Sequence, residues 1–128
     1  MIYAETSVLL AKLFAESASP PDAFWDESLV SSRLTEYEVW NRLHARKLEP
    51  SHGEAARNLL NRLAFVEMTP MTLARALEPF PVPVRTLDGL HLATMHFLYG
   101  KDPTLAVATY DTRLADAARK LKFKVLMP

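Results

Sequence analysis

Residues 85–95 read Arg-Thr-Leu-Asp-Gly-Leu-His-Leu-Ala-Thr-Met, and the rest of the chain is organised around this stretch. Apolar residues dominate it and continue to Leu98, so a helix formed here has little polar surface and is expected to be buried. Asp88 lies in the first turn of this helix, and His91 lies one turn later. A buried aspartate is normally paired with a cation or bound to a metal ion. The stretch therefore predicts a core helix that holds one carboxylate near its N-terminus.

Short apolar segments alternate with helical segments along the whole chain. The predicted strands are residues 1–4, 29–31, 65–69, 105–109 and 123–126. The predicted helices are residues 8–15, 33–47, 53–63, 70–77, 85–95 and 112–120, with a short one through Phe24 and Trp25. Apolar strands separated by helices are typical of a parallel sheet that is covered on both faces. We therefore expect an α/β fold, a three-layer α/β/α sandwich with a central parallel sheet, as a single domain over residues 1–128.

The composition limits the class of protein. With 49% hydrophobic residues among 128, the chain can bury a core and is not disordered. Fifteen basic residues balance fifteen acidic ones, which argues against bulk attraction to nucleic acid but allows an enzyme that handles it at one local site. The absence of cysteine excludes disulfides and thiolate metal sites.

The start of the chain does not resemble a signal peptide. Glu5 and Lys12 interrupt its apolar run, and no basic segment precedes that run. No segment is long and apolar enough to span a bilayer. We expect a cytoplasmic protein that is not associated with a membrane.

Four acidic residues occupy comparable positions at the ends of predicted elements. Glu5 follows the first strand, and Asp111 follows the strand that ends near residue 109. Glu38 and Asp88 lie near the starts of the helices that begin near residues 33 and 85. The carboxyl ends of parallel strands form the binding crevice of an open sheet. We therefore expect these four side chains to share one crevice.

Four carboxylates in one crevice repel each other and raise each other's pKa values. A hard divalent cation removes this conflict, because Mg²⁺ takes oxygen ligands and is bound through a few carboxylates together with substrate phosphate. Such an ion polarises a phosphodiester and activates water. The pattern points to metal-assisted hydrolysis of a nucleic-acid backbone.

Each acid also has a purely structural interpretation. Thr35 and Glu38 fit a capping box, and Asp111 fits a simple N-cap. Asp88 would gain from the helix dipole, and Glu5 could be a solvated strand end. From the residues alone, the metal site and the structural roles remain open alternatives.

Three further polar residues have two interpretations each. His91 on an apolar helix is more typical of a hydrogen-bonded core histidine than of a catalytic one. Ser7 and Thr109 could orient ligand carboxylates or a bound water. Alternatively, Ser7 or its neighbour Thr6 caps the first helix, and Thr109 is an ordinary strand residue.

Four arginines are candidates for RNA contact. Arg42 and Arg46 could approach a phosphate chain beside Glu38, although a solvated helix face is the more common role for such residues. Arg85 and Arg113 each neighbour a predicted site acid, so they either pair with it or contact RNA.

Four blocks of the sequence together resemble a known family. They are residues 1–11 (Met-Ile-Tyr-Ala-Glu-Thr-Ser-Val-Leu-Leu-Ala), 32–43 (Ser-Arg-Leu-Thr-Glu-Tyr-Glu-Val-Trp-Asn-Arg-Leu), 87–94 (Leu-Asp-Gly-Leu-His-Leu-Ala-Thr) and 108–118 (Ala-Thr-Tyr-Asp-Thr-Arg-Leu-Ala-Asp-Ala-Ala). In this order they resemble the PIN domain, specifically the VapC-type ribonuclease toxins of bacterial toxin–antitoxin pairs. The resemblance covers essentially the whole chain.

The resemblance implies a PIN-like fold and a Mg²⁺- or Mn²⁺-dependent endoribonuclease, the toxin component of a toxin–antitoxin system. Such an enzyme cleaves RNA phosphodiesters with a metal-activated water. The residues that match the family's four catalytic and metal-binding acids are Glu5, Glu38, Asp88 and Asp111. The resemblance also implies a homodimer and a VapB-type antitoxin whose C-terminal segment would block the acidic crevice.

Glu5 departs from the family pattern, which usually has aspartate at this position. The extra methylene moves the carboxylate, and this allows a second hypothesis from a different functional class. The chain could be a PIN-fold binding module with a weak or lost nuclease site.

Overall fold

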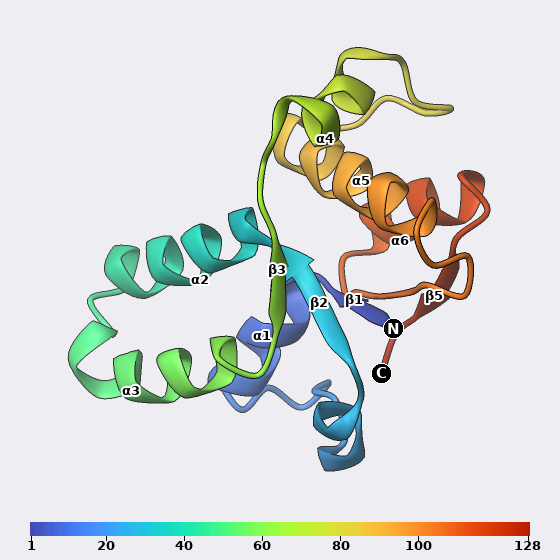
Figure 1. Ribbon diagram of the computed structural model, residues 1–128. Helices are drawn as coiled ribbons and strands as arrows, with labels where there is room; N and C mark the ends of the chain where they lie inside the picture. The colour runs from blue at the N-terminus through green and yellow to red at the C-terminus, as the bar shows by residue number, and fades with distance from the viewer.

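Five short strands form one parallel sheet at the centre of the computed structural model, which describes residues 1–128 (Figure 1). The strands are β1 (Ile2–Ala4), β2 (Leu29–Ser32), β3 (Ala64–Val66), β4 (Ala106–Ala108) and β5 (Lys124–Leu126). Their order in the sheet is β3-β2-β1-β4-β5, and every neighbouring pair is parallel. The predicted parallel sheet is confirmed.

β1 lies in the middle of the sheet and pairs with both β2 and β4. Ile2 lies opposite Leu29 on one side and opposite Ala106 on the other. The chain runs outward from β1 through β2 to β3 and then returns to place β4 on the other side of β1. In open α/β sheets, ligands bind at the position where the strand order reverses, outside the carboxyl ends of the strands.

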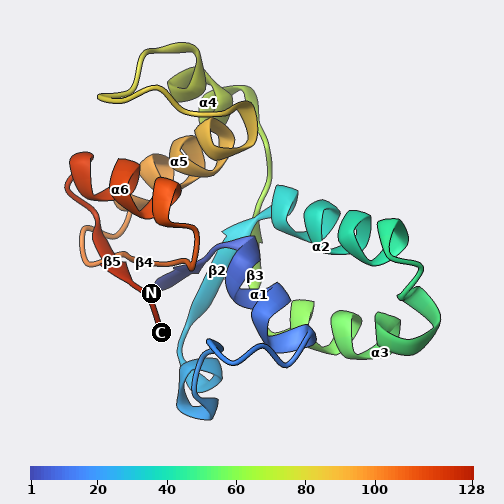
Figure 2. The same ribbon diagram turned by 180° about the vertical axis from the view of Figure 1, so that it is seen from behind.

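Helices cover both faces of the sheet. They are α1 (Thr6–Leu13), α2 (Arg33–Ala45), α3 (Glu49–Leu60), α4 (Pro70–Ala74), α5 (Thr86–Tyr99) and α6 (Thr112–Lys120), with 3₁₀ turns η1 (Asp22–Asp26) and η2 (Arg75–Leu77). α1, α2 and α3 lie on one side of the sheet, and α5 and α6 lie on the other, as opposite views show (Figures 1 and 2). This is the expected three-layer α/β/α arrangement. No helix combines the length and hydropathy of a transmembrane segment.

Alternation along the strands divides the hydrophobic core in two, because successive strand residues point to opposite faces. Tyr3 and Val107 pack in the core beneath α5 and α6. Ala4 and Ala108 pack in the core beneath α1, α2 and α3. The residues after β1 and β4 are therefore held at one edge by strands that are buried on both faces.

Several element boundaries differ from the sequence-based expectation, and three of the differences have a clear physical cause. α1 begins at Thr6 rather than residue 8, because the side chain of Glu5, and not that of Thr6 or Ser7, caps it. α3 begins at Glu49 rather than residue 53, with Pro50 in its first turn, where a missing N–H costs no helical bond. β3 ends at Val66 rather than residue 69, because its partner β2 ends at Ser32 and α2 follows at once.

Three helices end in a left-handed residue that is not glycine. Ala15, Lys47 and Lys122 have φ values of 49°, 56° and 71°. After α6, the N–H of Lys122 donates to the carbonyl of Arg119, and the N–H of Phe123 donates to the carbonyl of Ala118. This is the Schellman hydrogen-bond pattern, which normally carries glycine at the left-handed position.

Replacing Lys122 with glycine is expected to raise the free energy of unfolding by up to about 1 kcal/mol, because glycine adopts positive φ without the steric cost of a Cβ atom. Urea unfolding followed by circular dichroism measures this. Lys120→Gly, inside the same helix, is the matched control and should lower the stability instead. Equal losses in both variants would contradict the assignment of strain to Lys122.

Candidate active site

One cavity of about 520 Å³ is lined by all four acids that the sequence analysis selected. They come from four places in the chain: Glu5 after β1, Glu38 in α2, Asp88 in the first turn of α5 and Asp111 after β4. The remaining lining residues are Thr6, Ser7, Leu10, Arg42, Arg85, Thr86 and Leu87. The cavity lies at the carboxyl edge of the sheet, because Glu5 directly follows the central strand.

Glu5 is fixed by hydrogen bonds to one of its two carboxylate oxygens. Its Oε1 accepts from the N–H of Ser7 at 3.2 Å and from the Ser7 hydroxyl at 2.6 Å. The hydroxyl of Thr109 donates to the same oxygen at 2.8 Å. The side chain is only 7% exposed, so it is not the solvated strand end of the structural alternative. It caps α1 while its Oε2 accepts no hydrogen bond.

Glu38 is held through one oxygen as well. Its Oε1 accepts from the hydroxyl of Thr6 at 2.8 Å and lies 2.5 Å from Nε2 of His91. The predicted capping box with Thr35 is wrong. Ser32 caps α2 by accepting from the N–H of Leu34, so Glu38 lies in the second turn, beyond the reach of a cap.

Asp111 and Asp88 differ in their environments. Oδ1 of Asp111 accepts from the N–H groups of Arg113 and Leu114 at 3.0 and 3.1 Å, so the predicted N-cap is confirmed. The carboxylate of Asp88 is half-buried and takes part in no hydrogen bond within the protein. Burial raises the pKa of Asp88 above its ordinary value, and the nearby charge of Asp111 raises it further.

Every one of the four acids leaves at least one carboxylate oxygen without a protein donor. These oxygens are not sealed inside the protein, because Trp25 and Tyr110 are the only residues with a buried side-chain polar atom that lacks a partner. No three acidic or histidine side chains lie close enough together to hold a metal ion directly. Mg²⁺ usually keeps several waters and binds through one or two carboxylates, so the available oxygens fit a hydrated ion.

Ser7 and Thr109 form one hydrogen-bonded cluster with Glu5. Their hydroxyls lie 3.3 Å apart. The N–H of Tyr110 donates to the Ser7 hydroxyl at 2.9 Å, and the N–H of Asp111 donates to Oγ1 of Thr109 at 3.0 Å. The cluster links the residues that follow β1 to the residues that follow β4, at the position where the strand order of the sheet reverses.

Sequence reasoning missed part of the site. His91 is buried and hydrogen-bonded as predicted, but one of its partners is the site acid Glu38, and the other is Tyr3. Neither Tyr3 nor Thr6 was selected as a site residue. A tyrosine in the middle of a buried strand must find a partner for its hydroxyl, and that requirement could have drawn attention to Tyr3.

The four candidate arginines divide into two groups. Arg42 and Arg85 line the acid cavity, and Arg113 lines an adjoining hollow of about 210 Å³ that shares Arg85 and Asp88 with it. The predicted pairing of Arg85 and Arg113 with neighbouring acids is wrong, since neither forms an ion pair. Arg46 lies outside both cavities, with its guanidinium 4.9 Å from the ring centre of Phe14.

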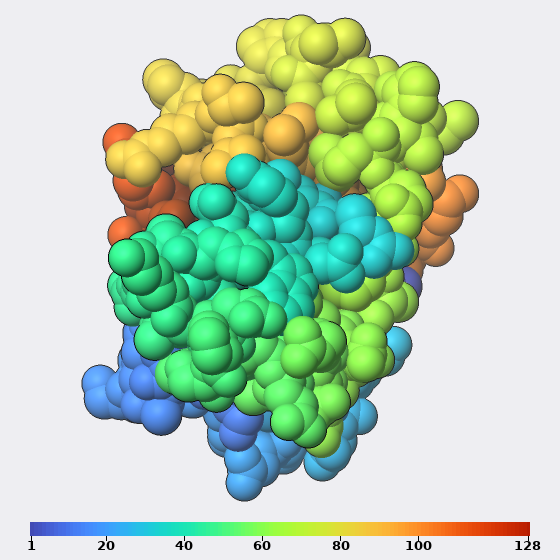
Figure 3. All heavy atoms as spheres, turned by 90° about the vertical axis from the view of Figure 1, so that its left-hand side faces the viewer, coloured from blue at the N-terminus to red at the C-terminus, as the bar shows by residue number.

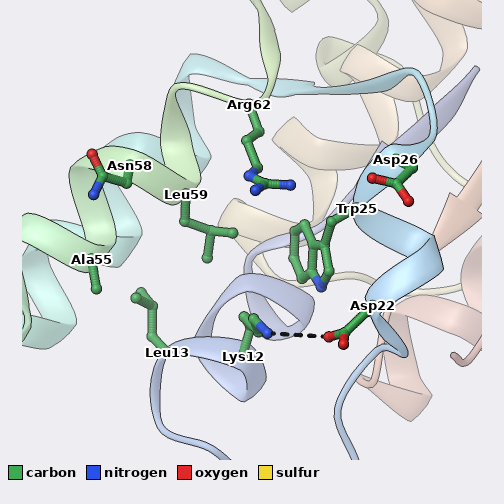
Figure 4. Close-up of a pocket in the computed structure, with 9 residues that line it drawn as sticks. All are labelled: Lys12, Leu13, Asp22, Trp25, Asp26, Ala55, Asn58, Leu59 and Arg62. Carbon is green, nitrogen blue, oxygen red and sulfur yellow. Dashed lines mark ion pairs between the residues drawn. The ribbon is translucent and has the colours of Figure 1, made fainter.

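A second large cavity, of about 510 Å³, lies between α1, η1 and α3 (Figure 4). Trp25 and Leu59 line it, and the ammonium of Lys12 pairs with Asp22 at 3.7 Å across its mouth. In the space-filling view, α2 and α3 lie side by side and form a broad surface below the α4–α5 part of the chain (Figure 3). None of the four acids reaches this second cavity, so the candidate chemistry belongs to the acid cavity alone.

Comparison with known proteins gives consistent results. The PIN domain family model matches residues 2–120. Ribonuclease VapC35 of Mycobacterium tuberculosis is 34% identical over 100% of this chain and 97% of its own length, and ribonuclease VapC47 of the same species is 31% identical over the same shares.

Two solved structures share the fold. A toxin–antitoxin complex from Klebsiella pneumoniae contains a chain with a TM-score of 0.66 and 17% identity, covering 100% of this chain and 98% of that one. PAE2754 from Pyrobaculum aerophilum has a TM-score of 0.60 and 16% identity, covering 91% of this chain and 83% of that one.

Asp88→Asn is expected to stabilise the metal-free protein at neutral pH. Because the pKa of Asp88 is raised in the folded state, the folded chain binds this proton more tightly than the unfolded chain does. The free energy of unfolding therefore falls as the pH rises from about 4, the ordinary carboxyl pKa, through the raised pKa. Urea unfolding at several pH values in EDTA measures the fall. Asp116→Asn, an exposed acid on α6, is the control, and identical pH profiles for wild type and Asp88→Asn would contradict the prediction.

Proposed function

The chain belongs to the PIN domain family of VapC ribonucleases, and we propose that it is a metal-dependent endoribonuclease, the toxin of a toxin–antitoxin pair. One observation carries this proposal. Carboxylates from four separate elements line one cavity at the sheet edge, and each leaves an oxygen without a protein donor. A nucleic-acid phosphodiester is the substrate for which such a set of oxygen ligands is suited.

Glu5, Glu38, Asp88 and Asp111 are the proposed ligands of a Mg²⁺ or Mn²⁺ ion, directly or through water. A bound ion of this kind polarises a phosphodiester and lowers the pKa of water. Ser7 and Thr109 would keep the Glu5 carboxylate in one orientation, because both hydroxyls end on its Oε1. The acids themselves would repel a bare phosphate, so a bound cation would strengthen the binding of the scissile phosphate at the cavity.

The length of Glu5 does not argue against an active site. Its additional methylene relative to aspartate is accommodated by folding the carboxylate back onto Ser7 and the first turn of α1. One carboxylate oxygen remains free after these bonds are made. This supports the nuclease over a binding module with a lost site.

RNA is proposed to approach along the three arginines beside the acids. Arg42 and Arg85 line the cavity, and Arg113 lines the adjoining hollow, which the apolar residues Val84 and Leu114 also line. Because the chain carries no net charge, attraction for RNA must be local rather than global. The hollow is a suitable place for the nucleotide next to the scissile phosphate.

Because the proposed substrate is RNA, we also propose that the protein acts in the cytoplasm.

We further propose that a VapB-type antitoxin is the protein partner and that the chain forms a homodimer. A toxin–antitoxin complex with the same fold supports the first part. The side chains of Met71 and Leu77 on the α4–η2 segment are 74% and 88% exposed, and large exposed apolar groups of this kind support an interface between copies.

Asp88→Asn is expected to reduce RNA cleavage to the level of a metal-free control while leaving the fold intact, because it removes one anionic ligand from the cavity. Cleavage of total tRNA and rRNA, with and without Mn²⁺ or Mg²⁺, measures the activity, and circular dichroism checks the fold. Asp116→Asn is the matched control and should cleave like the wild type. Wild-type cleavage that persists in excess EDTA would overturn the metal-dependent mechanism, and absence of metal binding at millimolar concentration in calorimetry would favour the binding module.

Arg113→Ala is expected to weaken RNA binding and to reduce its salt dependence. Each lost phosphate contact on a single strand should lower the slope of log K against log salt by about 0.7. Fluorescence anisotropy with a labelled RNA in the Asp88→Asn background, at several KCl concentrations, measures both quantities. Arg119→Ala, on the same helix but paired with Asp116, is the control, and an equal loss in both variants would argue against a specific contact at Arg113.

A further inference from the structure

His91 connects three elements of the fold through two short hydrogen bonds. It lies on α5 and is 1% exposed. Its Nδ1 lies 2.6 Å from the hydroxyl of Tyr3 on β1, and its Nε2 lies 2.5 Å from Oε1 of Glu38 on α2. The rings of Tyr3 and His91 meet edge to face, with centroids 5.9 Å apart. The central strand, the core helix and a site acid therefore share one continuous chain of bonds.

The direction of these bonds follows from the groups involved. The phenolic hydroxyl of Tyr3 carries a hydrogen that it can donate to Nδ1 of His91. A neutral imidazole that accepts at Nδ1 carries its hydrogen on Nε2 and donates it to Glu38. With Tyr3 as the donor, His91 has the tautomer whose Nε2–H can be donated to the Glu38 carboxylate.

The chain of hydrogen bonds fixes one of the two carboxylate oxygens of Glu38. Both of its donors, His91 and Thr6, end on Oε1. The second oxygen, Oε2, accepts no hydrogen bond from the protein and stays available at the cavity. Fixing one oxygen from the core therefore sets where the other one lies.

Packing alone does not require polar groups at these positions. The neighbours of His91 on α5, Leu92 and Met95, are fully buried apolar residues in the same core as Tyr3. Apolar side chains of similar size would fill this space without the cost of burying polar atoms. A polar pair kept in such a core and bonded to a site acid indicates a role at the site.

We propose that Tyr3 and His91 are positioning residues that orient the carboxylate of Glu38 for divalent-metal binding without themselves contacting metal or RNA. The proposal rests on the function proposed above, because it takes Glu38 as a metal ligand. Partners of this kind typically change metal affinity by about 10- to 100-fold when they are removed.

The test compares Mn²⁺ affinity, measured by calorimetry, in the wild type and in three variants. Tyr3→Phe removes only the hydroxyl and should weaken Mn²⁺ binding by about 10-fold or more. His91→Leu should weaken it at least as much, and His91→Gln, which keeps an N–H donor, should recover part of the loss. Thr94→Val and Tyr99→Phe are controls on the same helix that do not contact Glu38, and they should bind Mn²⁺ like the wild type.

A second measurement is independent of the metal. The ¹⁵N shifts of His91 in the metal-free protein should report a hydrogen on Nε2 in the wild type and a loss of this preference in Tyr3→Phe. A wild-type hydrogen on Nδ1, or Mn²⁺ affinities that are equal in Tyr3→Phe and wild type, would overturn the positioning role. A wild type that binds no Mn²⁺ while showing the Nε2 tautomer would overturn the proposed nuclease function, and the role of the pair in metal binding with it.

Discussion

The parallel pairing of β1 with both β2 and β4 is the constraint on which the molecule depends. β1 has three residues, yet it is the only strand that joins the two halves of the sheet. α1 follows β1 directly, α2 follows β2 and α6 follows β4. Because all strands run the same way, the residues that follow β1, β2 and β4 emerge at one edge. The acid cavity is a direct consequence of this alignment.

The same edge concentrates negative charge, and no lysine or arginine forms an ion pair with any of the four acids, although Arg42 and Arg85 line the cavity. The charge is instead distributed over hydrogen bonds from hydroxyl, imidazole and backbone donors, each directed to one oxygen of a carboxylate. Asp88 receives none of these bonds, and its burial, together with the nearby charge of Asp111, raises the pKa of its carboxyl. The carboxylate oxygens that remain without donors are consistent with the metal-dependent function proposed for this site.

Two of the four acids combine a capping role with a place in the cavity lining. Glu5 and Asp111 are the N-caps of α1 and α6, and both also line the cavity. A carboxylate has two oxygens, so one can satisfy helix N–H groups while the other faces a ligand. For Asp111, the two interpretations that the sequence left open are therefore compatible, whereas the capping role of Glu5 was not predicted and its solvated alternative is excluded by burial. For Glu38, by contrast, the capping role is excluded by the start of α2 at Arg33.

The sequence by itself determined the alternation of strands and helices, the parallel sheet and the positions of four acids at element ends. These features follow from local periodicity and from the geometry that parallel strands impose. Only the tertiary structure decided which side chains meet. Tyr3 and His91 are 88 residues apart, Thr109 and Glu5 are 104 apart, and no local pattern encodes such contacts. Arg46 is a residue for which the local pattern was misleading. It lies four residues after Arg42, yet its guanidinium lies against the ring of Phe14 and it does not line the cavity.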